Sequence, residues 1–202
     1  MKTLTLILLF ATHLLPAQDL KWHEGSVVLA SGEVVVGQVS MMAGRDVVLL
    51  RRATNVSILP KGDINHGADV LPAHKVQSVF YYDKQDNVNR RFVSHAVRHN
   101  SKAIQLYEIV LQGGLNVLRR TRSTSDSADA GDFDYFVDAS GAITPLWKFY
   151  RDVYPALDET SKQHLTAYAK ANGLQHADEA NLIRIVGYYN QLVRTGEKVA
   201  RN

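Results

Sequence analysis

The spacing of apolar residues changes near residue 146, and this change limits the fold more than any other feature of the 202-residue chain. Up to that point, short apolar runs are separated by turn residues, a pattern typical of β-strands. Beyond it, apolar residues recur at a spacing of about 3.6, which would place on one face of a helix Leu182, Ile185, Val186, Tyr189, Leu192 and Val193. The pattern predicts an α+β fold, in which an N-terminal β-rich meander or small barrel-like body precedes a C-terminal helical unit.

The β-rich part divides into short runs of strand length. Strands are expected at residues 26–30, 34–40, 46–51, 56–59, 76–82, 90–94, 104–111 and 115–120, with a last hairpin over 133–146. The remainder of residues 52–73 should be loop. Gly32 is expected to turn the first hairpin, and Gly37 to mark a bulge or a close contact. The Gly113-Gly114 pair would supply positive φ angles to another hairpin turn.

The helical unit is predicted to hold two helices after a short helical turn at 147–154. The first helix spans 159–172, with Asp158 as its N-cap and Gly173 just past its end. The second carries the apolar stripe, and Gly196 is expected to end it. We expect that stripe to pack on one face of the sheet and on the first helix through Leu165, Tyr168 and Ala169.

The first 18 residues have the pattern of a secretory signal peptide: Lys2, an apolar run from Leu4 to Leu15, and small residues around Ala17. We therefore expect a secreted or periplasmic protein, cut after Ala17 or Gln18. The predicted division is a signal peptide at 1–18, a β-rich domain at 19–146 and a helical unit at 147–202. No later run is long and apolar enough to predict a transmembrane helix in the mature chain.

The absence of cysteine excludes disulfides, thiol catalysis, thiolate metal sites and a lipid anchor on cysteine. Stability must then come from a packed core. The formal net charge of +3 is too small to indicate a nucleic-acid or membrane partner. A protein or a glycan of the cell envelope is the expected partner, and no nucleic acid and no cofactor are predicted.

Motifs for catalysis and metal binding fail on their spacing. Gly32 and Gly37 resemble the start of a phosphate-binding loop, but Gln38 and Val39 stand where that loop needs Lys and Ser or Thr. His95 and His99 are spaced as zinc ligands on a helix, yet Ala96 replaces the glutamate of the metalloprotease motif. A nucleophile elbow is absent. We predict no catalytic residue and keep His95 and His99 as the metal candidates.

The acidic run around Asp126, Asp129, Asp132 and Asp134 does not have the ligand spacing of a calcium-binding EF-hand loop. A solvated loop is the expected structure. Three basic residues precede it and are expected to balance its charge: Arg119, Arg120 and Arg122.

An aromatic cluster is the other candidate for binding. Phe80-Tyr81-Tyr82 and Arg90-Arg91-Phe92 could stack on a sugar or a base. Alternation along a strand would put Tyr81 on the face opposite Phe80 and Tyr82, so part of the cluster should be core. The candidate binding surface is Tyr81, Arg90 and Arg91.

The run "WHEGSVVLASGEVVVGQVS", residues 22–40, resembles the start of a group of secreted bacterial proteins with no assigned activity, and "YYDKQDNVNRRF" and "LIRIVGYYNQ" are similar to their later parts. The same start resembles Sm-like or SH3-like small barrels. The first resemblance implies export and a β-then-α layout. The second implies a strongly bent meander with a glycine in its second strand, and does not imply RNA binding. The leading hypothesis is a non-enzymatic interaction module of the cell envelope; the alternatives are an exported hydrolase with a non-local active site and a His-based metal binder.

Overall fold

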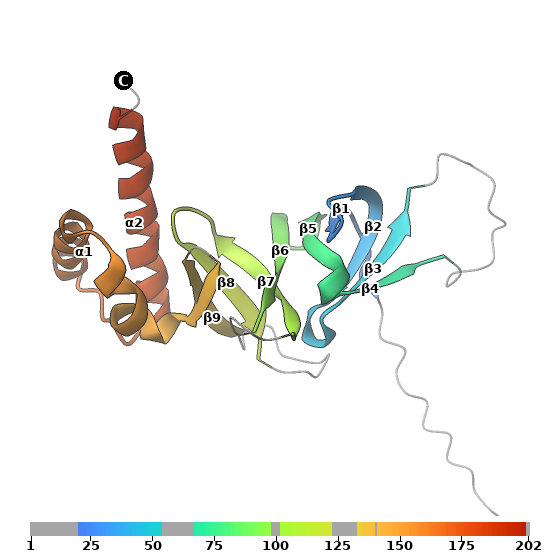
Figure 1. The fold of residues 1–202 in the computed structure, drawn as a ribbon, viewed down its shortest axis with the longest axis horizontal. Helices are drawn as coiled ribbons and strands as arrows, with labels where there is room; N and C mark the ends of the chain where they lie inside the picture. Colours follow the sequence, from blue (N-terminus) through green and yellow to red (C-terminus); the bar gives the residue numbers. More distant parts are fainter. Residues whose placement is uncertain (1–19, 54–66, 98–101, 123–132, 140, 201–202) are drawn as a thin grey trace, which may run out of the picture.

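The computed structural model describes residues 20–53, 67–97, 102–122, 133–139 and 141–200, with side chains up to residue 196. Its strands form a single ten-stranded antiparallel sheet, and the helices follow at the opposite end of the molecule from the first strands (Figure 1). The expected α+β class, a β-rich body followed by a helical unit, is confirmed. The strands are β1 (His23–Leu29), β2 (Val34–Met42), β3 (Val47–Arg52), β4 (Asp69–Pro72), β5 (Val76–Asp83), β6 (Val88–Ala96), β7 (Ile104–Leu111), β8 (Asn116–Thr121), β9 (Phe133–Ala139) and β10 (Ala142–Pro145).

The strand order is β10-β9-β8-β7-β6-β5-β1-β2-β3-β4, so β5 returns beside β1 and leaves β4 at the far edge. The turn η1 (Ala43–Arg45) joins β2 to β3, and the turn η2 (Ala73–Lys75) joins β4 to β5. Neighbouring strands pair through antiparallel ladders, with Val27 of β1 opposite both Val35 of β2 and Val79 of β5.

Asp46 ties distant parts of this sheet together. Its carboxylate accepts hydrogen bonds from the backbone N–H of Leu106 at 2.8 Å and from Nη2 of Arg120 at 2.9 Å, and its carbonyl accepts one from the N–H of Ala73 at 2.8 Å. Four strands separate β3 from β7 in the sheet order. Asp46 directly precedes β3, so its contacts with β7 require the sheet to curl back on itself. This curl agrees with the predicted meander or small barrel-like body.

The protein has two apolar cores on one face of the sheet. The N-terminal core fills the curled part, and its fully buried members are Val27, Val39, Val48, Leu50, Val79 and Leu106. The C-terminal core lies between the last strands and the helices, and its members include Val117, Val137, Phe149, Leu165, Ile185 and Val186. Burying an aliphatic side chain of this size contributes about 1.5–3 kcal/mol, so each core is a major source of stability.

Strand β7 passes from one core to the other. Leu106 lies in the N-terminal core, whereas Leu111 packs against the C-terminal core. The register with β8 shifts between Ile109 and Leu111, which is the mark of a bulge. Between the two apolar residues, Glu108 faces the same side of the sheet as Leu106, because side chains of a strand alternate. A charged residue therefore separates the two cores.

The helical unit begins directly after β10. Three short turns come first: the 3-10 turn η3 (Leu146–Lys148), the π-helix η4 (Phe149–Val153) and the 3-10 turn η5 (Tyr154–Ala156). Helix α1 (Glu159–Ala171) is capped at its N-terminus by Asp158, whose side chain accepts a hydrogen bond from the N–H of Ser161. Gly173 lies just past the end of the helix and has a φ of +61°. These caps agree with the prediction. Helix α2 (Glu179–Ala200) does not end at Gly196 as expected but continues past it.

The apolar stripe of α2 packs where the sequence predicted. Leu182, Ile185 and Val186 are buried in the C-terminal core together with Leu165 and Ala169 of α1. The rings of Tyr168 and Tyr188 stack at 4.1 Å between the two helices. The helices and the last strands therefore share one core.

The turn between β7 and β8 corrects a prediction. Gly113 and Gly114 do not have positive φ angles. A Cβ on Gly113 would instead lie 2.3 Å from the side chain of Asn190 in α2. That side chain accepts the N–H of Leu115 at 2.9 Å and donates to its carbonyl at 2.8 Å. Gly113 thus makes room for a helix side chain that binds the turn, which spacing along the chain could not reveal.

The three strands of the first meander lie where they were expected, but β1 begins three residues earlier than predicted, β2 ends two residues later and β3 is shifted by one residue. Gly32 has a φ of +88° in the turn, and a Cβ on Gly37 would lie 2.0 Å from the carbonyl oxygen of Arg51, so both glycines have the predicted roles. Strand β4 was not expected, because its four residues follow Gly67 closely and end at Pro72, in a stretch whose pattern predicts a loop. The strand expected at 56–59 lies outside the described residues.

Candidate functional site

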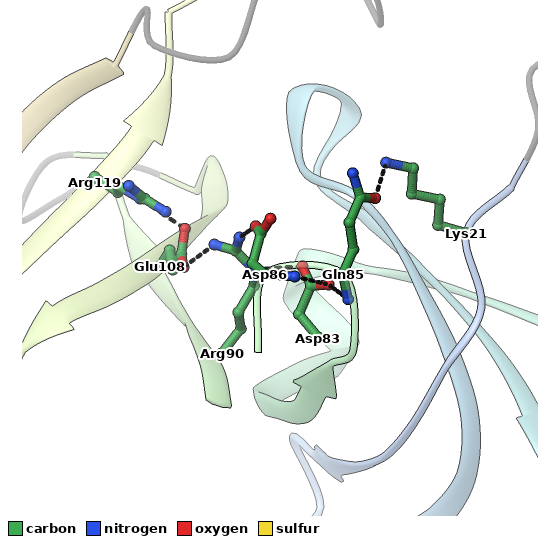
Figure 2. A network of polar contacts seen from close by, with 7 residues as sticks. All are labelled: Lys21, Asp83, Gln85, Asp86, Arg90, Glu108 and Arg119. Atoms are coloured by element: carbon green, nitrogen blue, oxygen red, sulfur yellow. Dashed lines mark hydrogen bonds and ion pairs between the residues drawn. The ribbon is translucent and has the colours of Figure 1, made fainter. Parts of the chain in front are cut away.

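The densest polar cluster lies around Arg90 on β6, between the two cores (Figure 2). Its Nε donates to Oδ2 of Asp83 at 2.9 Å, its Nη1 donates to Oε1 of Glu108 at 2.8 Å, and its Nη2 pairs with Asp86. Glu108 also accepts Nε of Arg119 from β8 at 2.8 Å. Four strands and the β5–β6 turn therefore meet in one ion network.

Burial and pairing set the protonation of this network. Burial would lower the pKa of Arg90, but the carboxylates of Asp83 and Glu108 raise it above its ordinary value. Burial would raise the pKa of Asp83, but hydrogen bonds from Arg90 and from the backbone of the turn hold it below its ordinary value. Burial raises the pKa of the neighbouring Tyr81 hydroxyl. All of these groups are held in the charge state they already have near neutral pH.

The network is built for structure. The Glu108 side chain is only 12% exposed, and both of its oxygens accept from arginines. A general acid or base exchanges a proton near neutral pH, and the raised pKa of Arg90 and the lowered pKa of Asp83 oppose such exchange by these two groups. We therefore assign this cluster to joining the two cores.

His95 and Asp138 form a second polar pair, on the opposite face of the sheet. Nε2 of His95 lies 3.8 Å from Oδ2 of Asp138, a contact between β6 and β9. Nδ2 of Asn116 donates to the same oxygen at 3.2 Å, and the N–H of Gly141 donates to Oδ1 at 2.8 Å. The fold thus brings together a histidine and a carboxylate that lie 43 positions apart in the sequence. The Ser94 hydroxyl donates to a backbone carbonyl instead of approaching His95.

The structure describes one of the two metal candidates. His95 lies on strand β6 and not on a helix, whereas His99 lies outside the described residues, so their pairing as metal ligands stays a prediction. Within the described ranges, no three His, Cys, Asp or Glu side chains gather closely enough to hold a metal ion. The acidic positions 126, 129 and 132 also lie outside the described part.

Two of the three basic residues before the acidic run bind carboxylates outside it: Arg119 binds Glu108 and Arg120 binds Asp46. Arg122 pairs with a member of the run, since its Nε lies 2.9 Å from Oδ1 of Asp134.

The candidate binding residues Tyr81, Arg90 and Arg91 do not share one surface. Tyr81 is 5% exposed, lies in the N-terminal core and stacks on His23 and Phe92. Arg90 belongs to the buried network. Arg91 is exposed on the other face of β6, where its Nη1 donates to Oε1 of Gln112 at 3.3 Å. Tyr81 and Arg90 lie opposite each other on the same face of the sheet, and alternation along β6 puts Arg91 on the other face, opposite Phe80.

The outer face of the curled sheet carries an exposed apolar strip. Val34 and Val36 on β2 are 61% and 62% exposed, and Phe80 and Tyr82 on β5 are 48% and 40% exposed. Ser26 of β1 pairs with both Val36 and Phe80, so β1 alone lies between the two pairs. We call these four residues the outer strip. The sequence hinted at it through the alternation of β2, but only the strand order shows that β2 and β5 share a neighbour.

A groove of about 490 Å³ lies beside the outer strip. Ser78, Phe80, Asn89, Arg91 and Gln112 line it, together with aliphatic side chains of β1 and β7. We call it the outer groove. A second groove of about 460 Å³ lies along β2 and β3 and is lined by residues that include Val36, Gly37 and Arg51. Grooves of this size, with an apolar floor and a few polar groups, are typical of ligand sites.

Comparison with known proteins yields no relative: no family model, no curated protein and no solved structure matches this chain. Among the described helices, none has the length and apolar character needed to cross a membrane. Function must therefore be argued from the chain itself.

Proposed function

We propose that the protein is an exported, non-enzymatic binding module of the cell envelope or extracellular space, and that it binds through the outer face of its curled sheet. The observation that carries this proposal is the outer strip, Val34, Val36, Phe80 and Tyr82, which stays 40–62% exposed. Large apolar side chains that gather on one exposed face mark interaction sites more often than isolated ones do.

The polar clusters support this proposal because their charged groups are already paired within the protein. Arg90 and Glu108 are engaged with each other and with further ionic partners, and the Asp46 carboxylate is engaged with Arg120 and with the backbone N–H of Leu106. The outer strip, in contrast, has apolar surface that water solvates poorly. Binding a partner there would remove that surface from water.

Photo-crosslinking in the producing cells tests the binding face. A benzophenone amino acid at Val36 or Phe80 should form an adduct in the envelope fraction, and the mass of the adduct would identify its chemical class. The matched control is the same label at Arg184, which is exposed on α2. Equal adducts at all three positions, or none at Val36 and Phe80, would contradict the proposal.

Export is tested by mass spectrometry of the protein recovered from the cell envelope and the medium. The signal pattern predicts a mature N-terminus at Gln18 or Asp19. Finding Met1 on the mature protein would overturn the exported location.

The His95–Asp138 pair is the observation that favours the hydrolase alternative. A histidine beside a carboxylate supplies two of the three groups of a hydrolytic triad. If that alternative holds, His95→Gln should abolish turnover of chromogenic ester or glycoside substrates, while the surface variant His164→Gln should keep it. We expect no turnover by either protein, and no change in melting temperature on adding a chelator, since a bound metal would stabilise the folded state.

A further inference from the structure

We infer that the outer groove binds a saccharide that carries a carboxylate. The inference deepens the proposed function, on which it rests, by naming the chemical class of the partner. It depends on three features of the groove: an exposed aromatic ring, a set of polar side chains around it, and an arginine with no carboxylate beside it among the described residues of the lining.

The ring is that of Phe80, which is 48% exposed on the outer face of β5. Its neighbours across the ladder are Ser26 on β1 and Arg91 on β6, so small or extended side chains flank the ring. A pyranose presents an apolar face of C–H groups that fits flat on such a ring. The negative charge of an aromatic face attracts these weakly positive hydrogens.

Polar side chains stand around this ring. The groove is lined by the Ser78 hydroxyl, the Asn89 and Gln112 amides and the Arg91 guanidinium. Each amide offers both donors and an acceptor, and a hydroxyl offers both as well. Sugar hydroxyls need donors and acceptors in this mixture. An apolar peptide side chain would instead leave these groups unsatisfied, which costs free energy.

Charge selects an acidic sugar. Arg91 lines the groove, and no carboxylate is among the residues lining it. Nη1 of Arg91 donates to Oε1 of Gln112 at 3.3 Å, which uses one of the five N–H donors of the guanidinium and holds the Gln112 amide in one orientation. Guanidinium groups bind carboxylates through two parallel hydrogen bonds. A uronic-acid residue stacked on Phe80 would place its carboxylate near Arg91.

The volume agrees with this class of ligand. A groove of about 490 Å³ holds a unit of one or two sugar rings. A protein hot spot, by comparison, is a desolvated pocket that takes an apolar anchor and is ringed by residues that exclude water. The outer groove is open and half polar, and we therefore assign it to a saccharide while the neighbouring outer strip supplies additional contact area.

The test is a titration of the purified, full-length exported protein, followed by the side-chain amide signals of Asn89 and Gln112 in NMR spectra. The probes are tetragalacturonate and a hyaluronan tetrasaccharide, with cellotetraose as the neutral control and hexaglutamate as the acidic peptide control. We expect at least one acidic saccharide to shift both amide signals. Cellotetraose and hexaglutamate should bind at least about tenfold more weakly.

Two variants assign the binding to the groove. Phe80→Ala should remove the stacking surface and Arg91→Gln the charge, and each should weaken the affinity by about tenfold or more with an unchanged melting temperature. Trp147→Ala and Arg52→Gln are the matched controls, since they remove an exposed aromatic ring and an exposed arginine away from this groove and should bind as the unmodified protein does.

The following outcomes would each contradict one part of the inference. If neither acidic saccharide shifts the two amides, or if both variants keep full affinity, the saccharide site is wrong. Equal binding of cellotetraose would overturn the selection of acidic sugars, and stronger binding of hexaglutamate would assign the groove to a peptide. A crosslinked protein at Val36 or Phe80 without any saccharide binding would refute this inference while leaving the binding module intact.

Discussion

The two apolar cores are built in different ways from the same sheet face. In the N-terminal core the sheet curls over its own side chains, and Asp46 holds the curl closed. In the C-terminal core the strands stay open and helices α1 and α2 cover them. The difference shows that one face of a continuous sheet can be buried either by curling of the sheet over its own side chains or by helices that pack on it. Glu108 and its arginines mark the boundary between these two solutions.

Continuity of the sheet predicts that the two cores unfold together. Leu50→Ala in the N-terminal core and Ile185→Ala in the C-terminal core should each lower the free energy of unfolding by about 2–5 kcal/mol, because both side chains are fully buried. Arg184→Ala, on the exposed side of α2, should change it by less than about 0.5 kcal/mol.

Two tryptophans report on the two regions separately. Trp22 lies beneath Arg51 near the N-terminal core, and Trp147 lies in η3 beside the C-terminal core. Each of the variants Trp22→Phe and Trp147→Phe keeps one tryptophan, whose fluorescence follows urea unfolding of its own region. When Ile185→Ala or Leu50→Ala is added to both variants, the two should unfold at the same urea midpoint. Two separate midpoints would show that the cores are independent units.

A substitution at the boundary between the cores should have the next largest effect on the free energy of unfolding. Glu108→Gln leaves Arg90 and Arg119 without their shared carboxylate in a mostly buried setting. We expect a loss of about 1–3 kcal/mol in urea unfolding, the cost of buried groups deprived of a charged partner. Glu24→Gln, at an exposed position of β1, is the matched control and should be near neutral. A harmless Glu108→Gln would mean that the ions do not join the cores.

The contact of α2 with the β7–β8 turn is expected to contribute less. Asn190→Ala removes the two hydrogen bonds to the backbone of Leu115 and should cost about 0.5–2 kcal/mol. Hydrogen exchange at Leu115 should quicken at the same time, because its N–H loses its acceptor. Gln191→Ala, one position along the helix and exposed, should leave that exchange rate as it is.

Acid should produce the smallest effect. The pKa of Asp83 is lowered in the folded protein, so this carboxylate contributes stability above its ordinary pKa of about 3.9 and loses that contribution as the pH falls through the lowered value. Unfolding midpoints of the unmodified protein should therefore fall below about pH 4. Asp83→Asn should show a flatter fall over this window. Identical pH profiles would remove Asp83 from the acid response.

Much of the architecture followed from local patterns alone. The period of two before residue 146 and of about 3.6 after it predicted the strands, the helices and the stripe of α2, because side-chain period depends only on backbone geometry. Asp158 and Gly173 predicted the limits of α1 for the same local reason. Strand β4 was missed, since four residues beside glycine and proline carry too little pattern.

Pairings across the fold were decided only by the tertiary structure. Nothing in the spacing of Asp46 and Arg120, 74 residues apart, or of Gly113 and Asn190 indicates that these residues meet. The candidate site shows the same division. Alternation separated Phe80 from Tyr81 in advance, but the outer groove exists because β5, β6 and the turn after β7 come together and bring Gln112 to Arg91. Sequence determines which face a side chain takes, and strand order determines which side chains it meets there.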